Sequence, residues 1–149
     1  MDRICRNGTH LLNLINDILD LSKVEAGKMQ LDLQAVHLPD LIQDILSQFE
    51  SQVRDKPVQL LAEIPAALPP LRTDPSKLRQ ILINLIGNAV KFTPRGSVRI
   101  KVVPGSGEHP VRQIEVIDTG IGIPKDRLDI IFEAFQQADY STARKFGGT

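Results

Sequence analysis

The first residues of the chain carry apolar side chains at helical spacing. A seven-residue repeat joins Ile4, Leu11 and Ile18, and a second row is formed by Leu14 and Leu21. These rows predict an amphipathic helix whose apolar stripe packs in a helical bundle. A single helix packed on its own domain is the alternative.

Beyond residue 28 the pattern alternates between strands and helices. Period-2 alternation and β-rich runs predict strands over Met29–Gln34, Val58–Ile64, Ser97–Val103 and Gln113–Ile117. Helical spacing predicts helices over Pro39–Arg54, Pro75–Phe92 and Lys125–Phe132. The last two strands flank the turn residues of Pro104–Gly107 and are expected to form a hairpin. The order up to the hairpin, β-α-β-α-β-β, predicts an α+β fold, a two-layer α/β sandwich preceded by the N-terminal amphipathic helix.

Composition and charge narrow the function classes. Of the 149 residues 42% are hydrophobic, and 18 basic side chains balance 18 acidic ones. A net charge of zero provides no field that attracts a polyanion, so we expect no nucleic-acid partner. The single cysteine, Cys5, excludes an internal disulfide, and no apolar run approaches the ~20 residues of a membrane span. These features predict a globular segment in a reducing compartment.

The helix predicted over Pro75–Phe92 has a polar face of unusual composition. Asn84, Asn88 and Lys91 fall within one ~60° arc of the helix surface. Because asparagine is a mediocre helix former, two of them one turn apart favour a role beyond helix formation. Their carboxamide oxygens suit a hard cation, and the lysine suits a phosphate. A merely solvated polar face is the alternative.

A second candidate site begins where the strand predicted over Gln113–Ile117 ends. Asp118 follows that strand, and Gly120 and Gly122 permit a ligand to approach the backbone closely. The carboxylate can accept a hydrogen bond from an exocyclic amine such as that of adenine. An ordinary Asp-Gly turn is the alternative, and the spacing fits neither a P-loop nor the dinucleotide-binding fingerprint.

A third candidate is the segment 141–149. Arg144 and Lys145 stand there beside glycines, with little apolar anchoring. Such a segment is typical of a mobile basic loop that covers phosphates. A frayed terminus is the alternative.

Several segments, in order along the chain, resemble the sensor histidine kinases of two-component systems. Asp74–Thr93 resembles the asparagine box of their catalytic ATP-binding domain, and Asp118–Pro124 resembles its first glycine box. Ile131–Asp139 is similar to the phenylalanine box, and Gly147–Thr149 is similar to the opening of the second glycine box. Upstream, Ile18–Lys28 resembles the end of the dimerisation helix and its junction with the catalytic domain.

The resemblance implies a fold, a domain division and partners. Residues 1–28 would be part of the second dimerisation helix with its junction, and residues 29–149 an ATP-binding domain of the histidine-kinase/gyrase type. That domain would be cut within the second glycine box, as an internal piece of a longer kinase. The implied cofactors are ATP and Mg²⁺. The implied partners are a second copy, bound through the N-terminal helix, and a response-regulator receiver domain. The segment would be cytoplasmic, and the sequence leaves open whether its parent is anchored in a membrane.

The same resemblance implies roles for single residues. Asn88 would ligate Mg²⁺ with Asn84 nearby, Lys91 would contact phosphate, and Asp118 would receive the adenine amino group. The full set of implied nucleotide-binding residues is Asn84, Asn88, Lys91, Phe92, Asp118, Gly120, Gly122, Arg144, Lys145, Gly147, Gly148 and Thr149. Phe92 would line the nucleotide pocket, and Arg144 or Lys145 would meet the terminal phosphate.

The phosphate-accepting histidine of the family is not matched in this chain. His10 is followed by Leu-Leu-Asn and lacks the adjacent acid and the later proline of the family's acceptor box, and His37 and His109 fit no better. We therefore expect the acceptor to lie upstream and the segment alone to be inactive as a kinase. A non-catalytic dimerisation or docking segment with weak nucleotide binding is one alternative, and an ATPase of the gyrase superfamily is another.

Steady-state ATP hydrolysis separates the last alternative from a kinase. Gyrase-type ATPases place a glutamate at the position of Asn84 to activate water, and a carboxamide has no accessible basic site. We expect phosphate release from ATP to stay near the uncatalysed background in a coupled phosphate assay. Sustained release would favour the gyrase-type ATPase.

Overall fold

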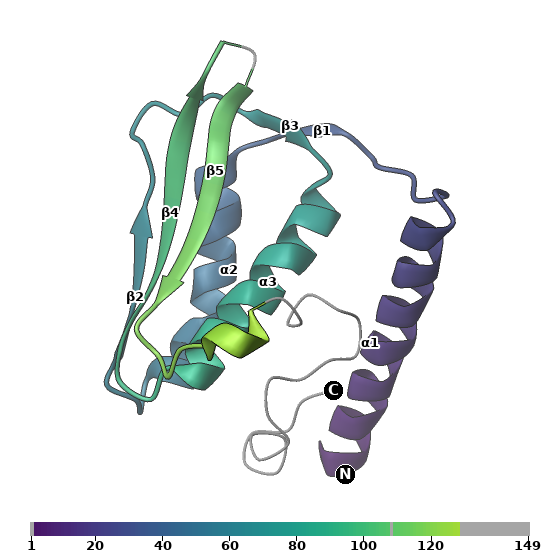
Figure 1. Cartoon of the computed structure of the whole chain (residues 1–149), viewed down its shortest axis with the longest axis vertical. Coiled ribbons are helices and arrows are strands. Elements are labelled where there is room, and N and C mark those ends of the chain that lie inside the picture. Colours follow the sequence, from purple (N-terminus) through teal and green to yellow (C-terminus); the bar gives the residue numbers. More distant parts are fainter. Residues whose placement is uncertain (1, 108, 129–149) are drawn as a thin grey trace. The chain divides into compact units, whose positions relative to one another are not determined.

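The chain forms two compact units, Met1–Asp32 and Leu33–Thr149. The computed structural model describes residues 2–107 and 109–128. In the first unit, α1 (Asp2–Glu25) is a helix, as the heptad pattern predicts (Figure 1). Six of its large apolar side chains are exposed, and Leu21 is half-buried; the exposed ones are Leu11, Leu12, Ile15, Ile18, Leu19 and Val24.

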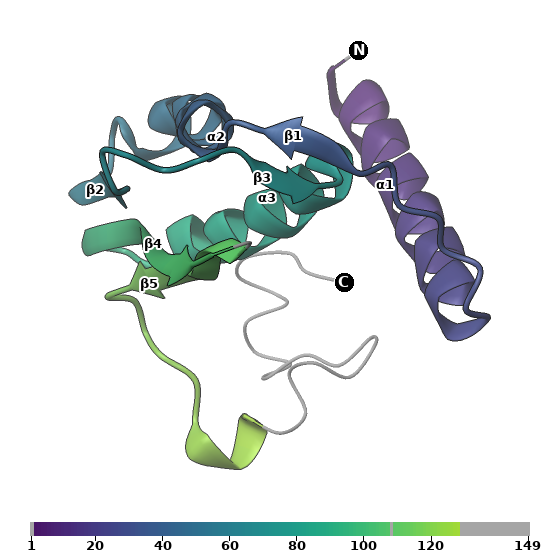
Figure 2. The ribbon, with the colours of Figure 1, turned by 90° about the horizontal axis from the view of Figure 1, so that it is seen from above.

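The second unit is the predicted α+β sandwich. Its elements are β1 (Gln34–Val36), α2 (Leu38–Val53), β2 (Val58–Glu63), β3 (Leu71–Thr73), α3 (Pro75–Phe92), β4 (Gly96–Ser106), β5 (His109–Asp118) and the 3₁₀ turn η1 (Lys125–Arg127). One sheet has the order β2-β4-β5, with β4 parallel to β2 and antiparallel to β5. A second, two-stranded sheet pairs β1 with β3. Figure 2 shows α2 and α3 with both sheets of this unit from above.

The structure corrects the sequence prediction at the first strand. Met29–Leu33 contains no strand, and β1 begins only at Gln34. Its partner is β3, which the sequence analysis missed, with Val36 opposite Leu71 in antiparallel register. Leu31 and Leu33 are about half exposed, whereas Val36 is buried. The alternation over Met29–Leu33 therefore has no partner strand to cover its apolar side.

The helix predicted over Lys125–Phe132 is described only in part. Residues 125–127 form the 3₁₀ turn η1, and residues from 129 onward lie outside the described part of the chain. The predicted hairpin is confirmed, since β4 and β5 pair from Val98 opposite Asp118 to Ser106 opposite His109.

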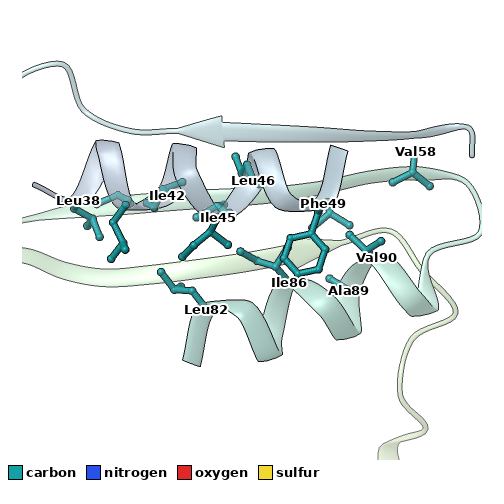
Figure 3. Close-up of a cluster of buried hydrophobic side chains, with 14 of the residues drawn as sticks. Leu38, Ile42, Ile45, Leu46, Phe49, Val58, Leu82, Ile86, Ala89 and Val90 are labelled. Atoms are coloured by element: carbon teal, nitrogen blue, oxygen red, sulfur yellow. The ribbon is translucent and has the colours of Figure 1, made fainter. Parts of the chain in front are cut away.

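The core lies between the two helices and one face of the β2-β4-β5 sheet (Figure 3). From α2 it receives Leu38, Ile42, Ile45 and Phe49, and from α3 it receives Leu82, Ile86, Ala89 and Val90. From β4 it receives every second residue, Val98, Ile100 and Val102, as expected of a strand with one covered face. One side of α3 is thus fixed against the rest of the unit.

Both ends of α3 follow from local chemistry. Oδ1 of Asp74 accepts the backbone N–H of Ser76 at 2.9 Å and that of Lys77 at 3.1 Å, and Pro75 occupies the first turn. This arrangement satisfies N–H groups that have no partner within the helix. The helix ends at Phe92, because Thr93 adopts an extended conformation before a proline.

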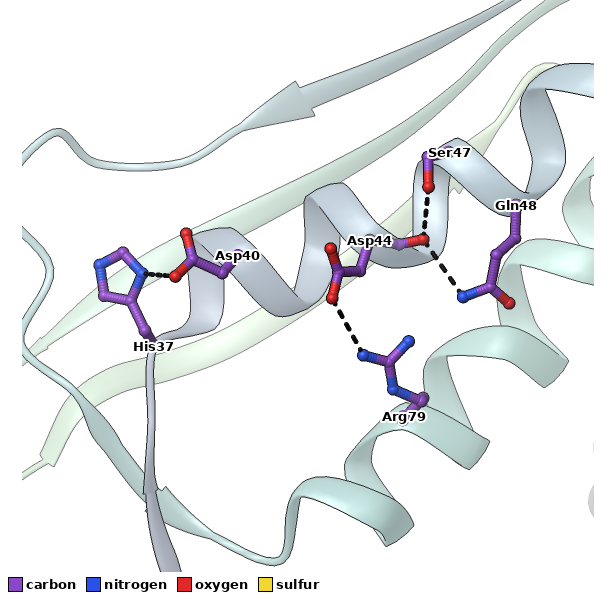
Figure 4. A network of polar contacts seen from close by, with 6 residues as sticks. All are labelled: His37, Asp40, Asp44, Ser47, Gln48 and Arg79. Atoms are coloured by element: carbon purple, nitrogen blue, oxygen red, sulfur yellow. Dashed lines mark hydrogen bonds and ion pairs between the residues drawn. The ribbon is translucent and has the colours of Figure 1, made fainter.

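Two exposed polar contacts lie at these helices, and one of them joins α2 to α3 (Figure 4). Arg79 on α3 reaches Asp44 on α2 at 3.3 Å, and His37 contacts Asp40 at 2.8 Å at the start of α2. Because these side chains are substantially exposed, such pairs contribute at most ~1 kcal/mol each. Apolar burial therefore positions α3.

Two isoleucines on α3 test this conclusion. Ile86 is fully buried, whereas Ile81 on the same helix is 55% exposed. We expect Ile86→Ala to lower the free energy of unfolding by about 2–5 kcal/mol, because it leaves a cavity. The matched Ile81→Ala should cost less than about 1 kcal/mol. Urea unfolding followed by circular dichroism measures both, and equal losses would contradict this packing.

Candidate functional site

One side of α3 remains open to solvent. Asn84 and Asn88 are exposed on it, one turn apart, and Lys91 and Phe92 are half-buried near its C-terminal end. Ile81 and Leu85 on the same side are also exposed, at 55% and 45%. The structure thus brings the two carboxamides and the lysine to one accessible helix face, as the sequence predicts.

The lysine is held near an aromatic ring. The Nζ atom of Lys91 lies 5.1 Å from the centroid of the Phe92 ring, within the range of a cation–π contact. The lysine also stands in the last turn of α3, where the helix dipole favours a positive charge. Both effects restrict where the ammonium can lie.

The glycine loop, defined here as Thr119–Gly122, follows β5. Asp118 is exposed at the end of that strand, and its Oδ1 accepts the backbone N–H of Gly120 at 2.8 Å. This bond orients the carboxylate through one oxygen. Within the described part of the chain, no further partner engages the carboxylate, so Oδ2 is available as an acceptor.

A backbone hydrogen bond joins the glycine loop to α3. The N–H of Ile121 donates to the carbonyl of Phe92 at 3.1 Å. A Cβ atom built on Gly120 would overlap that carbonyl oxygen, so the close approach requires glycine there. Gly122 has a φ of 70°, in the left-handed region that glycine adopts without strain. Asp118 and the C-terminal end of α3, the helix that carries Asn84 and Asn88, are therefore parts of one connected site.

Part of the predicted site lies outside the described residues. These positions are Arg144, Lys145, Gly147, Gly148 and Thr149. Among the residues that are described, no group of three or more His, Cys, Asp or Glu side chains could hold a metal ion. The carboxamides of Asn84 and Asn88, exposed one turn apart on α3, are oxygen donors that such a search does not include.

The structure also shows backbone contacts that the sequence analysis did not single out. The carbonyl of Phe92 and the N–H of Ile121 link the two halves of the site. Thr119 binds the start of β4, with its N–H donating to Ser97 O at 3.1 Å. The glycine at position 96 could have indicated such a contact, since a glycine within a strand often marks a close backbone approach. In the structure Gly96 has a φ of 116°.

Comparison with known proteins identifies the class. Residues 73–149 match the family described as histidine kinase-, DNA gyrase B-, and HSP90-like ATPase, and the chain belongs to this family. The match begins just before α3 and includes both that helix and the glycine loop. The resemblance to the ATP-binding domain of histidine kinases is thus confirmed.

Individual relatives are histidine kinases. The circadian input-output histidine kinase CikA of Synechococcus elongatus is 44% identical over 146 residues, which is 96% of this chain and 19% of CikA. The autoinducer 2 sensor kinase/phosphatase LuxQ of Vibrio vulnificus is 39% identical over 155 residues, covering 100% of this chain and 18% of LuxQ. The chain therefore spans about a fifth of the length of these curated relatives.

A solved structure supports the same class. Full-length ShkA, crystallised in complex with AMPPNP, superposes with a TM-score of 0.79 and 36% sequence identity. The match covers 90% of this chain and 28% of ShkA. The catalytic domain of histidine kinase ThkA superposes with a TM-score of 0.63 and 25% identity over 79% of each chain, so the chain has the fold of a histidine-kinase catalytic domain. Within the described residues, no helix is both long and apolar enough to cross a membrane.

Two glycines of the loop test its contact with α3. Gly120→Ala should destabilise the unit by ~1–3 kcal/mol, because the added Cβ would overlap the carbonyl of Phe92 and lie 2.8 Å from Asp118 Oδ1. Gly122→Ala meets no atom within 4 Å and should cost only the ~1 kcal/mol of its positive φ. Amide hydrogen exchange of Ile121 should accelerate in Gly120→Ala alone. Unchanged exchange in both variants would contradict the contact.

Proposed function

We propose that this chain binds ATP together with Mg²⁺ and orients the terminal phosphate for transfer to a histidine side chain. The observation that carries the proposal is the hydrogen bond from Ile121 to Phe92, which joins the C-terminal end of α3 to the glycine loop that follows Asp118. A base-recognising carboxylate and a phosphate-binding face thereby belong to one site. Membership of the histidine kinase-, DNA gyrase B-, and HSP90-like ATPase family supports nucleotide binding, and the similarity to the histidine kinase CikA supports transfer to a histidine.

Each part of the site has a role in this proposal. Oδ2 of Asp118 accepts a hydrogen bond from the adenine amino group, while Oδ1 remains bound to Gly120. The ammonium of Lys91 binds phosphate oxygens, and the Phe92 ring lines the pocket. Arg144 and Lys145, followed by Gly147, Gly148 and Thr149, are proposed to complete the phosphate end.

The donor set fits Mg²⁺. Asn84 and Asn88 present neutral oxygen ligands on consecutive turns of one exposed face, and hard divalent cations prefer oxygen. Mg²⁺ commonly binds through a few protein ligands together with substrate phosphates. When bound, it would neutralise charge on the phosphates, which is a main requirement of phosphoryl transfer.

The site favours transfer to a side chain over hydrolysis. Asn84 cannot take a proton from water at neutral pH. Phosphoryl transfer depends mainly on positioning and charge neutralisation, which Asn88, Lys91 and the bound metal supply.

The parent protein extends the proposal. We propose that residues 1–28 are part of a dimerisation helix, whose exposed apolar side chains suit a second copy, and that residues 29–149 are the catalytic domain. The acceptor histidine would lie in the parent outside this segment. A response-regulator receiver domain would then take the phosphoryl group, and the dependence on ATP suits a cytoplasmic location.

Calorimetric titration with AMP-PNP and Mg²⁺ tests the proposal. We expect saturable binding to the 149-residue chain and at least roughly tenfold weaker binding in Asn88→Ala, because a ligand of the metal is lost. Asp118→Ala should weaken the binding of adenosine as well. Gln43→Ala removes an exposed carboxamide from α2 and is the matched control, with no expected change. Absence of binding by the unaltered chain would favour the dimerisation or docking segment.

A further inference from the structure

The start of β4 and the glycine loop are joined through one side-chain hydroxyl. The backbone N–H of Ser97 donates to Oγ1 of Thr119 at 3.0 Å. The backbone N–H of Thr119 donates to the carbonyl of Ser97 at 3.1 Å, and the hydroxyl lies 3.5 Å from that same carbonyl. In a continuing ladder, the N–H of Ser97 would donate to the backbone carbonyl of Thr119. Here the Thr119 hydroxyl takes the place of that carbonyl as the acceptor.

The position of this junction makes it relevant to the site. The ladder between β4 and β5 ends with Val98 opposite Asp118, so Thr119 is the first residue beyond the last pair. Its neighbours are Asp118 and Gly120, the two residues joined by the carboxylate–amide bond of 2.8 Å. A displacement of Thr119 would move both of them.

Gly96 completes the junction. Its φ of 116° suits glycine alone, and a Cβ atom there would overlap Oγ1 of Thr119. Its own N–H donates to the carbonyl of Pro57 at 2.8 Å, before β2 begins. The residue pair Gly96-Ser97 thus ties the glycine loop to the central strand and to the segment leading into β2.

Other exposed features of the molecule give weaker support for a further site. The exposed apolar residues of α1 belong to the dimerisation role already proposed. The exposed pairs Arg99–Glu63 and Lys101–Glu115 lie on adjacent strands, and nothing in the structure indicates what would cover them. The Thr119 junction instead rests on several hydrogen bonds and lies beside the Asp118 carboxylate, which is proposed to recognise the base.

We propose that Thr119 is a positioning residue of the nucleotide site and acts through Asp118 and Gly120. Its hydroxyl holds the loop against Ser97, so that the Asp118 carboxylate is oriented before a ligand arrives. The inference rests on the proposed function in that the ligand is an adenine nucleotide. The junction itself can be measured without any nucleotide.

Amide hydrogen exchange of the ligand-free chain is the first arm of the test. Thr119→Val keeps the shape and removes the hydroxyl, so we expect Ser97, Gly120 and Ile121 to exchange roughly tenfold faster. Thr119→Ser restores the hydroxyl and should restore slow exchange. Core amides of α2, such as that of Ile45, should stay unchanged and show that the variants remain folded. Unchanged loop exchange in Thr119→Val would overturn the proposal, as would fast exchange in Thr119→Ser.

Nucleotide binding is the second arm. The Kd for AMP-PNP with Mg²⁺ should rise about three- to tenfold in Thr119→Val and return in Thr119→Ser. The Kd for adenosine should rise by a similar factor, while that for inorganic tripolyphosphate should not, because Thr119 acts on the adenine end. Ser97→Ala leaves both backbone partners of Thr119 in place and is the matched control, with no expected change.

Equal weakening of adenosine binding and tripolyphosphate binding in Thr119→Val would overturn the proposal. Failure of the unaltered chain to bind AMP-PNP would instead remove the proposed function, and the exchange arm would still decide whether the hydroxyl holds the loop.

Discussion

The site depends on α3 being packed from one side only. Leu82, Ile86 and Val90 bury one face against α2 and the sheet, and each buried side chain of this size stabilises the fold by ~1.5–3 kcal/mol. The opposite face carries Asn84 and Asn88 and has no cover among the described residues. A helix buried all round would leave no room for a ligand, and an unpacked helix would not hold two ligand atoms in place. One-sided packing meets both requirements.

Elements with strong local signals could be predicted from the sequence. The helix Pro75–Phe92 was found with both ends correct, because Asp74 and Pro75 begin it and the Thr-Pro step ends it. The strand predicted over Met29–Gln34 overlaps β1 only at Gln34 and was wrong over its other residues, and β3 was missed. A three-residue strand carries almost no periodicity, and both β1 and β3 exist through pairing with each other across the whole of α2 and β2. Such pairing depends on a distant partner and leaves little trace in either segment alone.

The positions of the candidate residues were more predictable than the contacts between them. Asn84, Asn88 and Asp118 could be placed from residue type and spacing, since a helix face and a strand end constrain where side chains point. The bonds that connect them could not be predicted in this way. Phe92 C=O and Ile121 N–H are backbone groups, and every residue other than proline carries both. Glycine was the sole local indication of such contacts, because a close backbone approach excludes a side chain.

Neutral metal ligands have a consequence for how the proposed site would be filled. Carboxamide oxygens bring no negative charge, and no cluster of three or more acidic, histidine or cysteine side chains occurs in the described part of the chain. Such a site attracts free Mg²⁺ weakly, because most of the favourable charge must come from phosphate oxygens. Lys91, on the same face, opposes a lone cation and favours a phosphate group. Metal and nucleotide would therefore bind as one unit, and the orientation of the adenine end by Asp118 would fix where the metal-bearing phosphates lie on α3.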